Sequence, residues 1–361
     1  MGLPSFEFAL GAANRIAGRY GGMAVWWYGV LARELDVMRV HVAPGRPNAF
    51  QELRLHYAFF SGTASAGTWG PHPDSGPPDP VAARLARLRQ RMAWPSGGPQ
   101  GVDATERDLD REELLSLTRE DLIGAIEFGH IYPVFQPQIS AQHGGIVGLE
   151  VLARWSDRGR HHAPDKFVGS ITSHGVETLL LDHFLGACAR VQTRFPQYTG
   201  RFSLNVNPTT AAAAGFVQGF VRAGISHGLD IARIVLELTE QTRISCGSEA
   251  RLLENLNALS ARGMVISQDD FGSGYASLQA LGLLPFKQVK VDKILLHRAR
   301  HAERARRLFS SSMALARSLE LQTVAEGVES PDDVVLARSL GADLLQGYAV
   351  SPPMPFERLQ L

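Results

Sequence analysis

From residue 130 to its end, the sequence alternates short apolar runs with helix-like stretches. The predicted strands cover residues 132–136, 148–155, 201–206, 233–238, 264–269, 288–291, 323–325 and 343–345. Amphipathic stretches at 177–195, 249–262 and 302–319 predict helices between them. Eight strands separated by helices favour a closed (β/α)8 barrel of the TIM type. An open, doubly wound sheet is the alternative that this pattern alone leaves open.

The first 112 residues contain no motif or repeat that indicates a fold. Residues 61–80 are rich in Gly, Pro and Ser, which is typical of a loop or linker. Further on, Thr118 is followed three residues later by Asp121, a variant of the capping box that predicts the start of a helix. We therefore expect an N-terminal region of unknown role over residues 1–112 and a main domain over residues 113–361.

Composition narrows the classes of partner and compartment. Thirty-six basic residues balance 36 acidic ones, which argues against binding to a nucleic acid polymer or to an anionic membrane. The two cysteines, Cys188 and Cys246, have no metal-type spacing and suit a reducing compartment. The most apolar early stretch, residues 21–32, is shorter than the roughly 20 residues of a membrane-spanning helix. We expect a cytoplasmic protein without membrane insertion.

Polar side chains stand inside or directly after successive predicted strands. Burying an ionised carboxylate without a partner is costly, and a divalent cation can compensate for it. Because the C-terminal ends of barrel strands meet at one mouth, these side chains could converge there. Oxygen ligands without clustered His or Cys favour Mg²⁺ or Mn²⁺ over zinc. The positions are Glu150, Asn205, Glu237, Asp269, Asp270, Lys290, Glu326 and Gln346.

Each of these residues alone also fits a plainer interpretation. A single Glu in a strand is more often on a polar surface, Asp-Asp before Phe-Gly is commonly a turn, and Lys290 alone would be a solvated lysine. Their recurrence at similar points in successive strands is what favours a site. The histidines of the Arg160-His161-His162 run are, by contrast, expected to form a solvated loop.

Seven segments follow one another in a characteristic order: EVLARW, SLNVN, ELTE, DDFGSGYASL, KVD, AEGVE and QGYAVSPPMP. Over residues 130–355 this set resembles the signature motifs of EAL-type cyclic di-GMP phosphodiesterases. The resemblance implies a (β/α) barrel with one antiparallel strand, which usually works as a homodimer. It also implies hydrolysis of cyclic di-GMP to linear pGpG with Mg²⁺ or Mn²⁺, using two ions.

The resemblance assigns a role to each candidate residue. It makes Glu326 a general base and gives Lys290 and Gln346 the positioning of the attacking water. Glu240 would anchor the DDFGSG loop, which Gly272 and Gly274 would allow to move. The first metal would be held by Glu150, Asn205, Glu237 and Asp269, with Asp269 bridging to a second ion near Asp270. The substrate contacts would be Gln136, Leu152 and Arg154.

The chain also departs from the family pattern without losing an implied ligand. Val151 replaces the Ala of Glu-Ala-Leu, and Asn207 replaces a usual Ser. The segment 167–175 carries Thr172 and Ser173 where the family is typically acidic, and Pro352 replaces a frequent lysine.

A receptor that binds cyclic di-GMP without cutting it, and reports through residues 1–112, is the main alternative to an enzyme. A regulator that acts purely by protein contact is a third.

Overall fold

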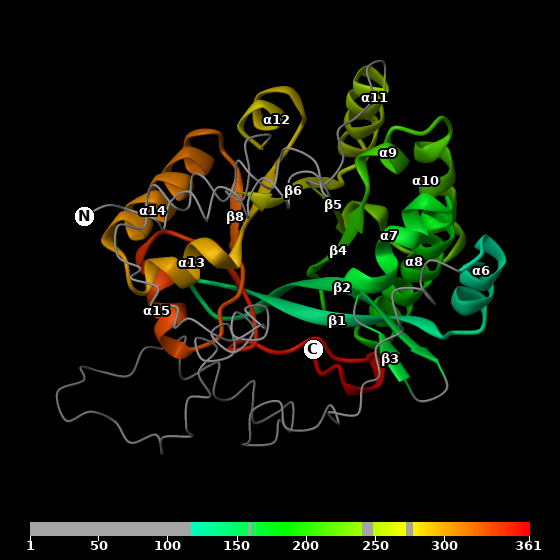
Figure 1. Ribbon diagram of the computed structural model, residues 1–361, viewed down its shortest axis with the longest axis horizontal. Helices are drawn as coiled ribbons and strands as arrows, with labels where there is room; N and C mark the ends of the chain where they lie inside the picture. Colours follow the sequence, from blue (N-terminus) through cyan, green and yellow to red (C-terminus); the bar gives the residue numbers. More distant parts are fainter. Residues whose placement is uncertain (1–116, 158–159, 163, 240–247, 272–276) are drawn as a thin grey trace, which may run out of the picture. The chain divides into compact units, whose positions relative to one another are not determined.

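The computed structural model describes residues 117–157, 160–162, 164–239, 248–271 and 277–361 (Figure 1). Within these ranges, eight strands close into a barrel in the order β1-β9-β8-β7-β6-β5-β4-β2, and β2 pairs back onto β1. The predicted (β/α)8 barrel is therefore confirmed. The strands are β1 (Ile131–Ser140), β2 (Ile146–Asp157), β4 (Arg201–Val206), β5 (Ile234–Leu238), β6 (Val265–Phe271), β7 (Gln288–Val291), β8 (Gln322–Ala325) and β9 (Leu344–Gln346).

One strand of the barrel runs against the others. β1 pairs antiparallel with both β2 and β9, whereas the pairs from β2 through β4 to β9 are parallel. The tight connection from β1 to β2 fixes the register, so that Gln136 faces Glu150 and Tyr132 faces Arg154. The beginning of β1 therefore lies at the same end of the barrel as the C-terminal ends of the parallel strands.

Helices surround the barrel and bury one face each against it. In α8, apolar residues recur at helical spacing, and Leu181, Phe184, Leu185 and Val191 are buried. The described helices of four or more residues are α6 (Arg119–Glu127), α7 (Pro164–Ser173), α8 (Glu177–Arg194), α9 (Pro208–Ala211), α10 (Phe216–Ser226), α11 (Glu249–Ser260), α12 (Ser277–Leu283), α13 (Lys293–Ala299), α14 (Glu303–Ser318) and α15 (Pro331–Ser339).

The capping box predicted at the start of α6 is present. The Thr118 side chain accepts a hydrogen bond from the backbone nitrogen of Asp121, and the Asp121 carboxylate accepts one from the backbone nitrogen of Thr118. The predicted domain start near residue 113 precedes the described residues and stays a prediction. None of the helices in the described ranges has both the length and the apolarity needed to cross a membrane.

The Arg160-His161-His162 run does not form the expected solvated loop. Residues Arg160–His162 form a short strand, β3, which pairs antiparallel with the end of β2. His162 is only 3 % exposed, and its ring meets Trp155 edge-on with 5.4 Å between centroids. The loop prediction was wrong because β2 extends to Asp157 and offers a free edge, and because an imidazole packs well against an aromatic ring.

Candidate active site

Lys290, on β7, lies at the centre of a cluster of acids inside the barrel. Its side chain is 2 % exposed, and its Nζ atom lies within 4 Å of four carboxylates, three on the strands β2, β5 and β6 and the fourth directly after β8. The polar side chains that the sequence places in or directly after successive strands therefore meet at one point. The distances from Nζ are 3.2 Å to Glu150 Oε1, 2.8 Å to Glu237 Oε2, 3.1 Å to Asp269 Oδ1 and 2.8 Å to Glu326 Oε1.

Asn205 joins the cluster because β4 and β5 pair in parallel with Asn205 opposite Glu237. Its amide nitrogen donates a hydrogen bond of 2.9 Å to Glu150 Oε1. The amide nitrogen is thereby turned toward an acid, and the amide oxygen is the atom that can bind a cation. Glu150 consequently receives donors from both Asn205 and Lys290 on the same oxygen.

A bulge in β6 brings two successive aspartates to the same site. Successive side chains of a regular strand point to opposite faces of the sheet. The register of β6 against β7 shifts between Gln268 and Phe271, and Asp270 has a φ of 53°. Bulges re-aim side chains in this way, and a left-handed residue other than glycine costs about 1–3 kcal/mol. As a result, carboxylate oxygens of Asp269, Asp270 and Glu326 lie within 4.8 Å of one another.

The cluster carries more negative charge than Lys290 alone can neutralise. Burial raises the pKa of Glu237 well above its usual range, against the attraction of Lys290, and the charges of Glu150 and Asp269 raise it further. Burial also raises the pKa of Glu326 to about 7, although Lys290 opposes the shift. Burial alone would lower the pKa of Lys290, but the surrounding carboxylates hold it well above its usual range.

Glu150 behaves differently from these two acids. Burial would raise its pKa, but Lys290 and the hydrogen bonds from Gln346 and Asn205 outweigh burial and lower it. Glu150 thus remains ionised beside the buried Glu237.

The donor set fits a divalent cation. Glu237 is 0 % exposed; among the described residues its Oε2 atom has Lys290 Nζ at 2.8 Å, and its Oε1 atom has no hydrogen-bond donor. A fully buried carboxylate that has only an ion pair with Lys290 has coordination capacity left for a cation. All the candidate ligand atoms are carboxylate or amide oxygens, which Mg²⁺ and Mn²⁺ prefer.

Three glutamines form the opposite side of the site. The Gln346 amide nitrogen donates to Glu150 Oε2 and, at 3.1 Å, to Gln136 Oε1. Gln138 donates to Gln346 Oε1 at 2.8 Å, and Gln136 donates to the backbone oxygen of Ser351 at 3.1 Å. Sequence reasoning missed Gln138. The available signal was its position two residues after Gln136 in a strand, which puts both side chains on one face.

A glycine next to Gln346 lets two segments of the site approach closely. Gly347 has a φ of 153°, and a Cβ atom there would collide with the backbone nitrogen and oxygen of Val328. The backbone nitrogen of Val328 donates a hydrogen bond of 3.0 Å to the backbone oxygen of Gln346. The end of β9 is therefore fixed against the segment that begins with Glu326.

Of the three predicted substrate contacts, Leu152 and Arg154 lie on β2, and Gln136 lies on β1 opposite Glu150. Glu150, Leu152 and Arg154 alternate along β2, so their side chains point the same way, and exposure increases from the buried Glu150 to the half-buried Leu152 and Arg154. They lead from the cluster toward the barrel mouth. Glu240 and the two loop glycines, Gly272 and Gly274, lie outside the described residues, so their roles stay predictions.

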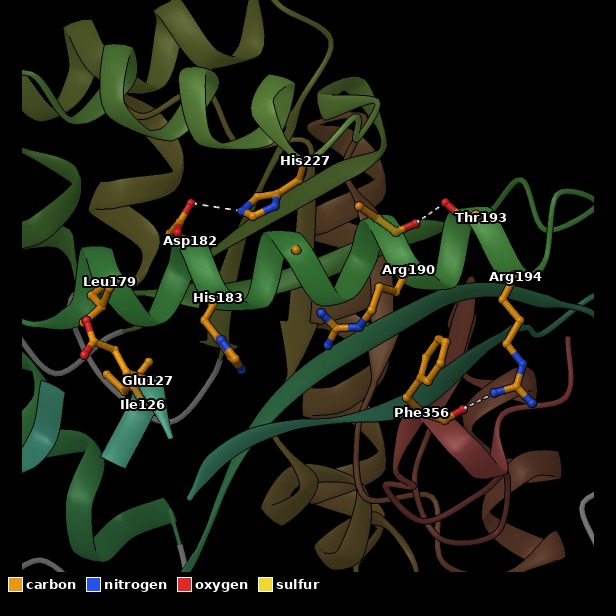
Figure 2. A pocket seen from close by; sticks show the side chains of 12 residues that line it. Ile126, Glu127, Leu179, Asp182, His183, Arg190, Thr193, Arg194, His227 and Phe356 are labelled. Carbon is orange, nitrogen blue, oxygen red and sulfur yellow. Dashed lines mark hydrogen bonds and ion pairs between the residues drawn. The ribbon is translucent and has the colours of Figure 1, made fainter. Parts of the chain in front are cut away.

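A separate hollow of about 690 Å³ lies outside the barrel, along α8 (Figure 2). Arg190 and Arg194 line it on either side of Phe356, and the acids Glu127 and Asp182 balance their charge. None of the predicted site residues lines this hollow. The candidate site is therefore the carboxylate cluster inside the barrel.

Comparison with known proteins gives the family. Residues 119–353 match the family described as EAL domain. The chain is 30 % identical over 263 residues to the cyclic di-GMP phosphodiesterase RocR of Pseudomonas aeruginosa, a match that covers 70 % of this chain and 65 % of RocR. It is 31 % identical over 243 residues to the cyclic di-GMP phosphodiesterase PdeL of Escherichia coli K12, covering 66 % of this chain and 67 % of PdeL.

A solved structure of the PaMucR phosphodiesterase in complex with c-di-GMP has the same architecture. It aligns with a TM-score of 0.61 and 31 % identity over 69 % of this chain and 100 % of that one. The bifunctional diguanylate cyclase/cyclic di-GMP phosphodiesterase MucR of Pseudomonas aeruginosa is longer, and the match covers 37 % of it. The chain thus spans less than two thirds of RocR and of MucR. Its match to the EAL domain over most of the barrel shows that the chain belongs to the EAL domain family.

Proposed function

We propose that this EAL domain hydrolyses cyclic di-GMP to linear pGpG with two Mg²⁺ or Mn²⁺ ions. The observation that carries the proposal is the convergence of four acids, from β2, β5, β6 and the segment directly after β8, on Lys290 inside the barrel. The names of RocR and PdeL, both cyclic di-GMP phosphodiesterases, support the substrate.

The oxygens of the cluster divide into two proposed sites. Glu150, Asn205, Glu237 and Asp269 would hold the first ion, and Asp269 with Asp270 would hold the second. Two divalent ions in such a set supply positive charge for the attacking and leaving oxygens of an in-line displacement and make water a better nucleophile.

Glu326 is the proposed general base. Its pKa of about 7 lets the carboxylate accept a proton near neutral pH, and its Oε1 atom lies 2.8 Å from Lys290 Nζ. Water would attack one phosphorus atom, and Glu326 would take the water proton. The phosphorus–oxygen bond opposite the water would break, and the released oxygen would keep the bonding electrons and take up a proton from solvent to become a hydroxyl of pGpG. Lys290 and Gln346, whose nitrogens lie on two sides of Glu150, would orient that water.

Arg154 is the proposed phosphate contact at the mouth. A guanidinium can present two parallel donors to a phosphate group. Gln136 and Leu152, deeper and half-way along the same wall, would complete the contacts. The Val151 departure bears on packing alone, because Val151 is buried opposite Phe135 on the other face of β2.

The test is an assay of the whole chain with cyclic di-GMP and Mn²⁺, followed for pGpG. We expect pGpG to accumulate, and we expect Glu326→Gln to stop its formation. Glu303→Gln is the matched control, because Glu303 is an exposed acid paired with Arg307 at 3.2 Å. Binding of cyclic di-GMP without pGpG would support the receptor alternative instead. A homodimer stays a prediction of the family resemblance, and a cytoplasmic location stays a prediction of the composition.

A further inference from the structure

Glu177, the first residue of α8, turns its carboxylate toward the segment that follows β4. The residue is 8 % exposed. Its Oε1 atom accepts a hydrogen bond of 2.7 Å from the backbone nitrogen of Asn207, and its Oε2 atom accepts one from the Thr210 hydroxyl. The Thr172 side chain, on α7, donates a third. One carboxylate thus links two helices to the β4–α9 segment.

That segment carries the candidate ligand Asn205. Asn207 lies two residues beyond it and caps α9, because its side chain accepts a hydrogen bond of 2.9 Å from the backbone nitrogen of Thr209. The backbone at residue 207 is therefore fixed by its own cap and by Glu177. Since two peptide units connect Asn207 to Asn205, a shift at Asn207 would displace the Asn205 amide.

Stability alone does not account for an acid at this position. Burial raises the pKa of Glu177, although the hydrogen bonds from Thr210, Asn207 and Thr172 oppose the shift. The neighbouring buried positions of α8, such as Leu180 and Leu181, are apolar. A buried acid that is costly yet fully hydrogen-bonded to a ligand-bearing segment is typical of groups that orient ligands.

We propose that Glu177 is a positioning residue for the metal site, holding the end of β4 so that Asn205 presents its side-chain oxygen to the divalent ion. The inference rests on the proposed function. It also gives the Thr172 and Ser173 departure a physical meaning. The acidic group missing from that segment is supplied one helix later, and Thr172 supports it with a hydrogen bond.

The test is calorimetric titration of the whole chain with Mn²⁺ alone, without nucleotide. We expect Glu177→Ala to weaken Mn²⁺ binding about tenfold, the usual size of effect for groups that orient metal ligands. Glu177→Gln keeps the shape and one acceptor, so we expect a smaller loss in the same direction. Asp182→Ala is the matched control, because Asp182 lies on the same helix and pairs with His227 at 3.1 Å, away from β4. It should leave Mn²⁺ affinity unchanged.

A double variant tests the route through Asn205. In an Asn205→Ala background, Glu177→Ala should weaken Mn²⁺ binding much less than in the wild type, because coupled residues are not additive. Thr172→Glu should restore part of the affinity lost in Glu177→Ala, because it returns a carboxylate to the same place.

Three outcomes would overturn the inference: wild-type Mn²⁺ affinity in both Glu177 variants with only a lower melting temperature, full additivity with Asn205→Ala, or an equal loss of affinity in Asp182→Ala. If Glu177→Ala does not fold, Glu177→Gln alone decides between the first outcome and the expected one. A wild-type chain that binds Mn²⁺ but produces no pGpG would overturn the proposed function separately, since the titration contains no nucleotide.

Discussion

The two sides of the candidate site are built from different chemical groups. On the acidic side, Glu237, Asp269, Asp270 and Glu326 come from parallel strands and the segments that follow them. On the amide side, Gln136, Gln138 and Gln346 come from β1 and β9, which pair antiparallel. Glu150 stands between the two sides: its Oε1 accepts from Asn205 and Lys290, and its Oε2 accepts from Gln346.

The difference separates two requirements of the site. The acidic side gathers four carboxyl groups around the single cation Lys290, and burial, with the neighbouring carboxylates adding to it, raises the pKa values of Glu237 and Glu326. The amide side consists of neutral groups whose donors and acceptors satisfy one another, so it can fix orientations without adding charge. Variants on the acidic side should therefore change cation binding, and variants on the amide side should change turnover at constant cation binding.

The largest effect is expected from Glu237→Gln. Loss of this buried ligand should lower turnover of cyclic di-GMP by about 1,000-fold, or about 4 kcal/mol of transition-state stabilisation. The melting temperature with a chelator present should stay the same or rise, because an acid whose ionisation is disfavoured by burial and by Glu150 and Asp269 has been replaced by a neutral amide. Turnover with Mn²⁺ and a thermal melt with EDTA measure the two quantities. A melting temperature many degrees lower would show that Glu237 stabilises the fold itself.

An intermediate effect is expected from Lys290→Arg, which keeps the charge at the centre of the acidic side. We expect turnover to fall at least about tenfold, or about 1.4 kcal/mol. An ammonium is a compact donor that can touch several carboxylates at once, whereas a guanidinium is planar and broad. The measurement is turnover at saturating Mn²⁺, with a thermal melt as the control for folding. Near wild-type turnover would remove Lys290 from the proposed catalytic groups.

The smallest effect is expected from Gln138→Leu on the amide side. Gln138 fixes which end of the Gln346 amide faces Glu150, so its loss should lower turnover about fivefold, or about 1 kcal/mol, while Mn²⁺ affinity stays constant. Gln288→Leu is a matched control. It breaks another amide pair, between the buried Gln288 and the exposed Gln322 at 3.0 Å, at the N-terminal end of β7. If Gln138→Leu weakened Mn²⁺ binding as much as Glu237→Gln does, the separation of the two sides would be wrong.

The barrel strands could be predicted from the sequence because each one is a short apolar run that is separated from the next by a loop or a helix-like stretch. The residues of the cluster could be named because a carboxylate inside an apolar run, as at Glu150 or Glu237, is unexpected in a strand that is otherwise built to be buried. Their convergence required only the general rule that parallel strand ends meet. For these elements, local pattern and tertiary structure agree.

Other features depend on partners that are distant in sequence. β3 forms because the edge of β2 is free, and His162 is buried because Trp155 lies beside it. In the sequence, Gln138 and Glu177 are ordinary polar residues. In the folded chain, Gln138 contacts Gln346, which is 208 positions away, and Glu177 contacts Asn207, which is 30 positions away. Nothing in the local sequence around these residues specifies those contacts.

The reversed direction of β1 changes where the chain enters the barrel. In a fully parallel barrel, the first strand starts at the end opposite the catalytic mouth. Here Ile131 is paired with Trp155 at the mouth, and α6 ends at Glu127, a few residues before it. A displacement of α6 would therefore act directly on the start of β1, where Tyr132 is paired with Arg154 at the rim of the site. The inverted strand thus places the connection between α6 and the barrel at the rim of the candidate site.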